Sequence, residues 1–515
     1  MSIELRQAAP ILTAILLVGT AARAEVPLSA IDWLSKSVAT PAALPQEPLD
    51  EPAVSNDAGT QDIAVSILDA PSPDGAGLLS PKVTGLPRAL WGLGKTEEIV
   101  SLIRSERPDT LPSLQALLNT LMLAEAVPPV DSGGRGDLLL ARVDELLDVG
   151  ALEQAQALLD AAGSNQPELF RRSFDVALLT GSEDIACERM RDNPELAPTF
   201  PARIFCLARS GDWNAAALTL RTAQALGFVT PEEDELLSRF LDPDLYEGEP
   251  PMAKPSRPTP LVWRMFEAIG EPLPTNTLPL AFAHAELRDT AGWKAQIEAA
   301  ERLARTGAIA PNRLMGFYTD RKPAASGGVW DRVAGVQALD DALTAGNGAE
   351  VERILPGVWD LMATAELEVP FAELFASSLQ QAGLRGQASA IAFKVALVSP
   401  DYAAAATARK AADPAEAFLI GLASGNIKGI TPTDSLGRAI APAFLNPMPS
   451  LEVQALVKDG MIGQAILKAI DQISEGLRGS NPSKVTEGLS LLRVVGLEDA
   501  ARRTALELLL LERRG

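Results

Sequence analysis

From about Leu86 to the C-terminus, apolar side chains recur at helical spacing, and short turns containing Gly or Pro separate one apolar stretch from the next. This pattern predicts one helix after another. One helix start is explicit in VTPEEDELLSRF, where Thr230 can cap the helix, Pro231 can occupy its first position, and the acidic residues 232–234 complement the helix dipole. Only 5% of the residues are aromatic, and Ala and Leu dominate, which favours helices over sheets. We therefore predict an all-α protein.

A helical-hairpin pattern recurs within this region. A glycine follows an apolar helix, and a small residue stands five positions later in the next helix. The glycine permits the turn and the alanine allows two helices to approach closely. The four pairs are Gly150 and Ala155, Gly211 and Ala216, Gly460 and Ala465, and Gly496 and Ala501. The frame also continues from Gly386, although Ile391 replaces the small residue.

These hairpins resemble tetratricopeptide and Sel1-like helical repeats. Gly211, Trp213, Ala216 and Ala223 match the Gly, aromatic, Ala and Ala positions of the second tetratricopeptide helix. The resemblance implies an irregular, tetratricopeptide-like solenoid of helical hairpins, with Trp213 packed in its core.

The spacing of the hairpins fits such a repeat only in part. Gly460 and Gly496 are 36 residues apart, close to the roughly 34-residue repeat period. Gly150 and Gly211 are 61 residues apart, and Gly386 and Gly460 are 74 apart. Either divergent repeats occupy the gaps, or the body is an ordinary array of antiparallel helices without repeat ancestry.

The N-terminus is typical of a secretory signal peptide. Arg6 precedes an apolar run, Ile11–Val18, and Ala22 and Ala24 stand at the A-x-A positions. Residues 1–24 are therefore expected to be removed by cleavage after Ala24, which predicts a periplasmic or secreted protein. A short membrane anchor is the alternative, but the run falls well below the roughly 20 residues that cross a bilayer. No other apolar stretch has that length, so we do not expect the chain to span a membrane.

Residues 25–86 form a Pro- and Ala-rich stretch whose prolines interrupt any long helix, which predicts a largely disordered, extended arm. Two apolar islands lie within it, Leu28–Ser35 and Ile63–Ala70. Such islands either bind a partner or fold back on the body. The candidate partner-binding residues, on or near the arm, are Ile31, Trp33, Leu34 and Trp91.

A second Pro-rich stretch, residues 242–260, divides the helical region. Its composition predicts a linker between an N-terminal helical-hairpin block, residues 87–241, and a C-terminal block, residues 261–515.

Charge and cysteine content narrow the function. The chain has 45 basic and 67 acidic residues, a net charge of -22. Such an acidic surface repels phosphate backbones, so we do not expect nucleic-acid binding. Cys187 and Cys206 are 19 residues apart, and in an oxidising compartment they predict a disulfide between neighbouring helices. A pair of buried free thiols is the alternative.

Two segments suggest chemistry but have simpler explanations. The only histidine, His284, has Leu280 and Leu287 at helical spacing around it, which predicts a structural residue on a packed helix. Gly94, Lys95 and Thr96 match the end of a phosphate-binding loop, but Ala89 occupies the position of its first glycine. A helix capped by Thr96 explains the same residues.

No cluster of cysteines and histidines has the spacing of a metal site, so no metal or cofactor is predicted. Carboxylates are abundant because the chain is acidic, so sequence alone selects no catalytic pair among them.

The whole chain also resembles a secreted family of alphaproteobacteria whose function is not established and which is sometimes labelled an antifreeze glycopeptide polyprotein. The segments SAIDWLSKSVATP, ELFRRSFDVALLTG and PARIFCLARSGDWNAAALTL account for the resemblance. Tandem Ala-Ala-Thr repeats are absent from the sequence, so an antifreeze role is not expected.

The sequence therefore predicts a non-catalytic scaffold of the cell envelope whose stacked hairpins bind a protein or an extended peptide. One alternative is an enzyme that uses carboxylates on cell-wall or other polysaccharides. The other is a structural subunit of an envelope complex.

Overall fold

The computed structural model describes residues 72–163 and 166–511. Within these ranges the chain is helical, and one isolated parallel bridge between Leu79 and Ala124 is the only β pairing. The all-α prediction is confirmed. The predicted signal peptide, the candidates Ile31, Trp33 and Leu34, and the island Ile63–Ala70 lie outside the described residues.

The first half of the described chain forms a centre and an outer lobe. The central elements are η1 (Pro73–Gly75), α2 (Pro81–Thr84), α3 (Thr96–Ser105), α4 (Pro112–Leu123) and α5 (Asp137–Asp148). The outer lobe consists of α6 (Leu152–Ala162), α7 (Pro167–Thr180), α8 (Glu183–Asp192), η2 (Pro194–Leu196), α9 (Phe200–Arg209), α10 (Trp213–Ala225), α11 (Pro231–Leu241), η3 (Pro243–Tyr246) and α12 (Pro260–Ala268).

The second half returns from the lobe and passes around to the starting helices. The returning elements are η4 (Leu280–Leu287), α13 (Trp293–Arg305), α14 (Pro311–Thr319), α15 (Val329–Thr344), α16 (Gly348–Thr364), α17 (Glu368–Gln381) and α18 (Gly386–Leu397). The closing helices are α19 (Tyr402–Ala408), α20 (Pro414–Ser424), α21 (Ser435–Leu445), α22 (Leu451–Lys458), α23 (Ile462–Arg478), α24 (Pro482–Val494) and α25 (Glu498–Leu510).

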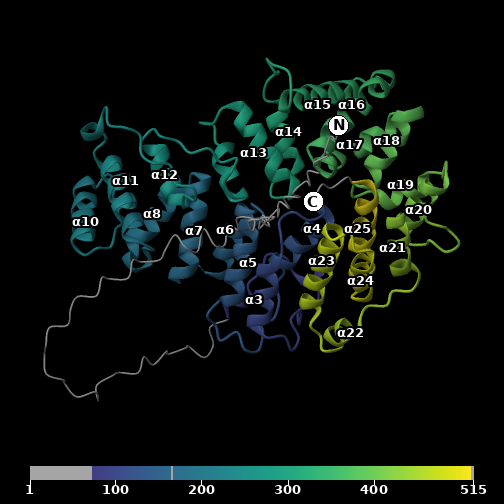
Figure 1. Ribbon diagram of the computed structural model, residues 1–515, viewed down its shortest axis with the longest axis horizontal. Coiled ribbons are helices and arrows are strands. Elements are labelled where there is room, and N and C mark those ends of the chain that lie inside the picture. Colours follow the sequence, from purple (N-terminus) through teal and green to yellow (C-terminus); the bar gives the residue numbers. More distant parts are fainter. Residues whose placement is uncertain (1–71, 164–165, 512–515) are drawn as a thin grey trace, which may run out of the picture.

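The two ends of this path meet, so the central helices form a closed ring. In Figure 1 the C-terminal helices α23 to α25 lie beside α3 and α4, while α10 and α11 lie at the far left of the outer lobe. α25 packs against α4, and α23 packs against both α3 and α4. The ring continues from α5 through η4, α13, α14 and α17 to α18 and then through α19 and α20 back to α25. We call this arrangement the helical ring.

The hydrophobic core crosses the division at residues 242–260. One core cluster includes Leu114 and Leu118 of α4 together with Ile466 of α23 and Leu506 of α25. A second cluster lies in the returning arc and includes Leu303 of α13. The first cluster therefore contains residues of both sequence blocks, 87–241 and 261–515.

The stretch 242–260 lies against the helices on either side of it. It contains η3, and the Met252 amide donates to the Glu271 carboxylate over 2.9 Å. Arg239 of α11 donates to the carbonyl of Pro250 over 3.0 Å. Because α11 and α12 also pack against each other, this stretch connects two helices that are already in contact.

The end of the predicted arm is part of the folded body, which corrects the boundary at residue 86. The buried guanidinium of Arg142 donates to the carbonyls of Ala76 at 2.7 Å and Met122 at 2.7 Å, and it also bonds those of Asp74 and Ala124. Gly77 lies so close to the residues that follow α4 that an added Cβ would be 2.3 Å from the Glu125 nitrogen. The sequence does not predict that residues 72–86 are folded, because the residues that anchor them are distant in sequence.

Three helices near the ring closure are capped by carboxylates from other segments. Asp131 accepts from the Thr96 amide of α3 over 2.9 Å, and Asp74 accepts from the Leu139 amide of α5 over 2.8 Å. The Ser113 amide of α4 donates over 2.9 Å to Glu507 of α25. Free amides at a helix start are satisfied by such oxygens, which also complement the helix dipole.

The prediction that Thr96 caps its helix is therefore wrong. The N-cap of α3 is Lys95, without a side-chain cap, and Thr96 lies inside the first turn. Its hydroxyl donates to Asp131 over 2.7 Å. By contrast, the predicted start of α11 is confirmed: Thr230 and Glu233 form a reciprocal capping box, and Pro231 between them is the first residue of the helix.

The hairpin glycines and alanines have the geometry that their spacing requires. Each of the four glycines has a positive φ, a conformation that side chains disfavour, and each of the four alanines is fully buried. The glycines are Gly150 (φ 78°), Gly211 (85°), Gly460 (73°) and Gly496 (87°), and the alanines are Ala155, Ala216, Ala465 and Ala501.

Candidate functional site

Two adjoining cavities lie between the helices of the ring. The larger has a volume of about 630 Å³ and the smaller about 320 Å³, and Arg305 and Thr306 contribute to the walls of both. The larger is lined by residues 108–111 before α4, by the C-terminal ends of α13 and α23, and by Leu280 and Glu366. The smaller is lined by α4, the α5–α6 and α13–α14 turns, and the start of α17. These walls come together only because the ring closes.

Three arginines line the larger cavity. Arg302 and Arg305 lie one turn apart on α13, and Arg478 ends α23. None of the three forms an ion pair with a carboxylate among the described residues. Burial lowers the pKa of Arg302; the charge of Glu286 opposes this shift, and the positive charge of Arg305 adds to it. The cavity is therefore locally basic within an acidic protein.

Backbone carbonyls hold two of these arginines in place. Arg302 donates to the carbonyls of Thr275 at 3.1 Å and Leu278 at 3.2 Å. Nε of Arg305 donates to the carbonyl of Ala365 over 2.7 Å. Neutral carbonyls orient a guanidinium without cancelling its charge, so both side chains keep their full attraction for an anion.

The same cavity has two carboxylates and a pair of hydroxyls. Asp109 is paired with Arg107 at 2.9 Å, and this contact lowers the pKa of Asp109 against the opposing effect of burial. Glu366 is the other carboxylate in the wall. The hydroxyls of Thr110 and Ser474 share a hydrogen bond of 2.8 Å, which joins the segment before α4 to α23.

Close to the ring closure is a cluster of acidic residues from three helices. Burial raises the pKa of Glu145 on α5 and of Glu106 at the end of α3 well above the ordinary value, and the charges of neighbouring carboxylates add to both shifts. Asp471 of α23 is one of the neighbours of Glu106. Oε1 of Glu145 is buried without a hydrogen-bond partner. The environment favours the protonated form of both glutamic acids.

The structure corrects the predictions for two tryptophans: the one expected to be exposed is buried, and the one expected to be buried is exposed. Trp91, a candidate partner-binding residue, is only 2% exposed and packs on α23 so closely that a Cβ at Gly463 would be 2.4 Å from its ring. Trp213, expected in the core, is 51% exposed and touches Phe240 from the side, with 6.3 Å between ring centroids. Both predictions are wrong. Trp91 is buried because α23 returns to cover it, and Trp213 is exposed because α10 lies at the edge of the outer lobe.

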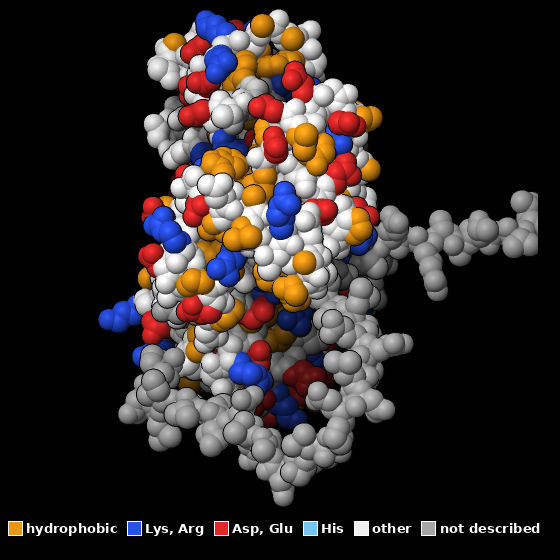
Figure 2. All heavy atoms as spheres, turned by 90° about the vertical axis from the view of Figure 1, so that its left-hand side faces the viewer, with side chains coloured by type: hydrophobic (Ala, Val, Ile, Leu, Met, Phe, Trp, Pro, Cys, Tyr) orange, Lys and Arg blue, Asp and Glu red, His pale blue; other side chains and the backbone are white. Residues whose placement is uncertain are grey.

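The face that ends the outer lobe is chemically mixed. Figure 2, which views the molecule from the left of Figure 1, shows hydrophobic side chains interspersed with acidic and basic ones. Exposed hydrophobic residues of this lobe include Ile185, Leu218 and Leu226. The hydrophobic groups on this face are broken up by charges.

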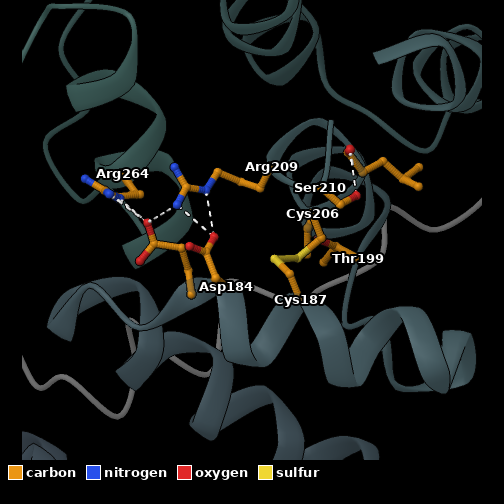
Figure 3. The surroundings of a disulfide bond; sticks show 10 residues. Asp184, Cys187, Thr199, Cys206, Arg209, Ser210 and Arg264 are labelled. Atoms are coloured by element: carbon orange, nitrogen blue, oxygen red, sulfur yellow. Dashed lines mark hydrogen bonds and ion pairs between the residues drawn. A yellow bond between two sulfur atoms is a disulfide. The ribbon is translucent and has the colours of Figure 1, made fainter. Parts of the chain in front are cut away.

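The predicted disulfide is confirmed. Cys187 of α8 and Cys206 of α9 are bonded, with 5.1 Å between their Cα atoms, and both side chains are buried (Figure 3). The bond joins two neighbouring helices of the outer lobe. It lies close to a network of charged residues that links these helices to α12.

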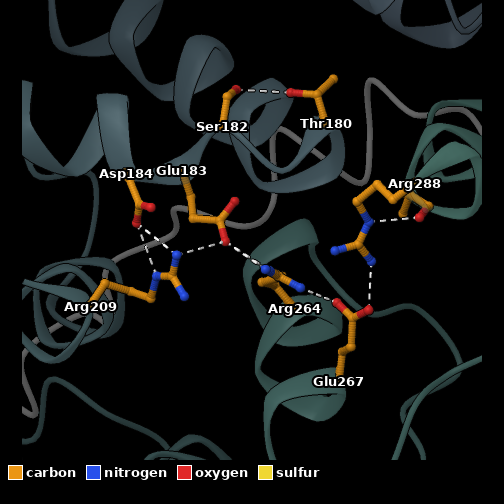
Figure 4. Close-up of polar contacts among 9 residues, drawn as sticks. Thr180, Ser182, Glu183, Asp184, Arg209, Arg264, Glu267 and Arg288 are labelled. Atoms are coloured by element: carbon orange, nitrogen blue, oxygen red, sulfur yellow. Dashed lines mark hydrogen bonds and ion pairs between the residues drawn. The ribbon is translucent and has the colours of Figure 1, made fainter. Parts of the chain in front are cut away.

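That network ties the two sides of the 242–260 stretch together (Figure 4). Glu183 of α8 is buried and accepts from Arg264 of α12 over 2.7 Å. Arg264 also pairs with Glu267, which accepts from Arg288 over 2.6 Å. Arg209 of α9 extends the chain of ion pairs from Glu183 to Asp184. These charges are engaged with one another, so they serve the packing of the lobe.

His284 has a structural environment. It is buried in η4, a 3-10 helix rather than the α-helix that the spacing suggested, and its Nε2 is 2.6 Å from the carbonyl oxygen of Gly150. Burial lowers its pKa to about 4. The residue thereby fixes the α5–α6 turn against η4.

The phosphate-loop resemblance at residues 94–96 also has a structural explanation. The Asp131 carboxylate occupies the start of α3, where a bound phosphate would have to lie. A Cβ at Gly94 would be 2.2 Å from the side chain of Gln464, so this glycine permits close packing against α23.

Two further features are absent from the described residues. No helix in these ranges has both the length and the apolar character to cross a membrane. Over the same ranges, no group of three or more His, Cys, Asp or Glu side chains is arranged to hold a metal ion.

The arginine-lined cavity was not found from the sequence. Arg302 and Arg305 are close in sequence, but Arg478 lies on a different helix 173 positions after Arg305, and no motif connects them. Comparison of the chain with protein-family models finds no match. Comparisons with curated proteins and with solved structures also find none.

Proposed function

We propose that this protein is a non-catalytic helical scaffold that binds a protein or peptide partner, and that the partner enters the cavities of the helical ring. The observation that supports this most directly is the pair of adjoining cavities, about 630 and 320 Å³, whose walls come from helices distant in sequence. Concave sites between packed helices are common places for ligands, and cavities of several hundred Å³ match the usual size of such sites.

Two further parts of the proposal come from the sequence. The N-terminal pattern supports export to the periplasm, and the disulfide fits an oxidising compartment. The turn glycines and buried alanines support an origin of the hairpins in degenerate repeats of the tetratricopeptide or Sel1 kind. N-terminal sequencing of the mature protein tests the first part, which requires a chain beginning at Glu25.

The experiment that tests the scaffold function is crosslinking of the mature protein in its own cells, followed by mass spectrometry. Photoreactive residues at Leu477 and Ala116 probe the larger and smaller cavities, and one at the exposed Leu218 of α10 serves as the control. The proposal predicts one dominant envelope protein captured from the cavities and not from the control. Self-links alone, or the same mixture from every position, would overturn it.

A carboxylate-dependent enzyme of the cell wall is the second candidate, and the Glu106 and Glu145 pair favours it. Raised carboxyl pKa values are common among catalytic acids. The test is hydrolysis of cell-wall fragments by the protein and by Glu106→Gln, a change that keeps the shape and removes the acid. Turnover that disappears in the variant would support the enzyme and displace the scaffold.

A structural subunit of an envelope complex is the remaining alternative. Deletion of the protein separates it from the scaffold: a structural subunit predicts loss of a complex, whereas a scaffold predicts loss of one bound partner from an otherwise intact envelope.

A further inference from the structure

The three arginines that line the larger cavity have many hydrogen-bond donors between them. Each guanidinium has five N–H donors in a planar fork. The carbonyl bonds use two donors of Arg302 and one of Arg305. Arg478 is exposed and forms none of the hydrogen bonds recorded for the described residues. Donors therefore remain available on all three side chains.

The balance of charge in the cavity favours an anionic ligand. The carboxylate of Asp109 is paired with Arg107, so the wall of the larger cavity has Asp109 and Glu366 beside three arginines, and the charge of Glu286 also acts on Arg302. A network of like charges in one cavity is unfavourable until an anion binds, because each cation raises the free energy of its neighbours. The charge of Arg305 is one of the causes that lower the pKa of Arg302, after burial and against the opposing charge of Glu286.

The shape and the remaining walls indicate what kind of anion fits. Arg305 and Thr306 line both cavities, so the larger and the smaller one lie next to each other along the ring. Leu111, Leu280 and Leu477 provide apolar wall between the charges. An extended peptide has carboxylates at intervals with apolar or backbone groups between them. A compact ion such as phosphate would fill only one end.

We infer that the helical ring binds an acidic peptide segment whose carboxylates pair with Arg302, Arg305 and Arg478. This inference rests on the proposed scaffold function and specifies the chemistry of its partner. Arg–carboxylate pairs can be bidentate, which fixes the position of the peptide as well as attracting it. Arg305 lines both cavities, so a peptide that pairs with it lies beside both.

The chain itself has an acidic segment outside the described residues. Residues 25–71 contain eight Asp or Glu and a single Lys. An acidic partner must therefore be distinguished from this stretch of the same chain. A full-length variant with those eight residues changed to Asn or Gln makes the distinction without shortening the protein.

The test uses fluorescence anisotropy with two labelled decapeptides, one of alternating Gly and Glu and one of alternating Gly and Gln. The protein is the mature chain, alone and with Arg305→Gln or Arg478→Gln. Arg478→Lys keeps the charge and should retain most of the binding. Arg221→Gln, on the exposed face of α10, is the matched control for the loss of one positive charge. Thermal unfolding of each variant verifies that it folds.

The expected result is binding of the Glu peptide, with little binding of the Gln peptide. Arg305→Gln and Arg478→Gln should each weaken it by about tenfold or more, because each removes charge-assisted hydrogen bonds to the peptide carboxylates. Arg221→Gln should leave it unchanged, and added salt should weaken it. Tighter binding after neutralisation of residues 25–71 would identify the chain's own segment as a competing acidic peptide, which the inference also allows.

Two outcomes would overturn the inference in different ways. Equal binding of the Glu and Gln peptides would leave the ring as a peptide-binding scaffold without a carboxylate preference. Failure of both peptides, together with stabilisation by inorganic phosphate that Arg478→Gln abolishes, would assign the cavity to a small anion and remove the scaffold function at this site as well.

Discussion

Asp175 on α7 provides the sharpest test of the energetics of the outer lobe. Its side chain is 5% exposed, and its Oδ2 has no hydrogen-bond partner among the described residues. Burial raises its pKa from 3.8 to about 7, although the charges of Arg171 and Arg172 oppose the shift. The folded protein therefore holds a proton on Asp175 at a pH where the unfolded chain has lost it.

The sign and size of the effect follow from this shift. A carboxyl whose pKa is raised on folding stabilises the protein fully below pH 3.8, and that contribution is lost as the pH rises through about 7. The shift of about 3 pKa units corresponds to about 4 kcal/mol, at about 1.4 kcal/mol for each unit. Asp175→Asn keeps the shape and cannot ionise, so relative to this variant the native protein should lose about 4 kcal/mol between pH 4 and pH 8.

The assay is chemical denaturation of both proteins at a series of pH values. The difference between them is the informative quantity, because His284 titrates over an overlapping range with the opposite sign and is common to both. Asp192→Asn, whose side chain is 72% exposed, is the control and should follow the native protein at every pH. A difference between the native protein and Asp175→Asn that stays constant from pH 4 to pH 8 would refute the reasoning.

Four further predictions concern other contacts. In the native protein, His284 should contribute about 3 kcal/mol of stability above pH 6.5, and this contribution should be lost as the pH falls through about 4. His284→Gln should remove this pH dependence. A denaturation series in which the variant retains it would contradict the prediction. Replacing Cys187 and Cys206 by Ser should cost about 3 kcal/mol in chemical denaturation, since the bond closes a loop of about 20 residues; reductant should have the same effect on the native protein and none on the variant. Arg142→Met should destabilise the protein by about 3 kcal/mol or more, because four carbonyls lose their hydrogen-bond donor. It should also make residues 72–80 accessible to limited proteolysis. Unchanged protection from the protease would show that other contacts anchor that segment. Gly463→Ala should destabilise the protein by about 1–3 kcal/mol in thermal unfolding, because its Cβ would overlap Trp91. Gly357→Ala, in open space on α16, is the control and should be neutral or stabilising by up to about 1 kcal/mol. Equal effects of the two changes would rule out overlap as the cause.

Features that depend on neighbouring residues could be predicted from the sequence alone. The spacing of apolar residues is enough to predict helices, because each helix buries a face defined by residues three and four positions apart. The Thr230 capping box was predictable because all its atoms lie within one turn. The disulfide was predictable because Cys187 and Cys206 are the only cysteines of the chain.

Features that join distant segments could be known only from the tertiary structure. The return of α23 and α25 to α3 and α4 closes the ring, buries Trp91 and brings Glu507 to the start of α4. Nothing near residue 113 in the sequence indicates that its amide is capped by a residue almost 400 positions later. The arginine-lined cavity has the same origin, because Arg478 joins Arg302 and Arg305 only through the closure of the ring. Local patterns specify helices, whereas the packing of many helices is determined by the sum of weak contacts between surfaces that no single stretch of sequence contains.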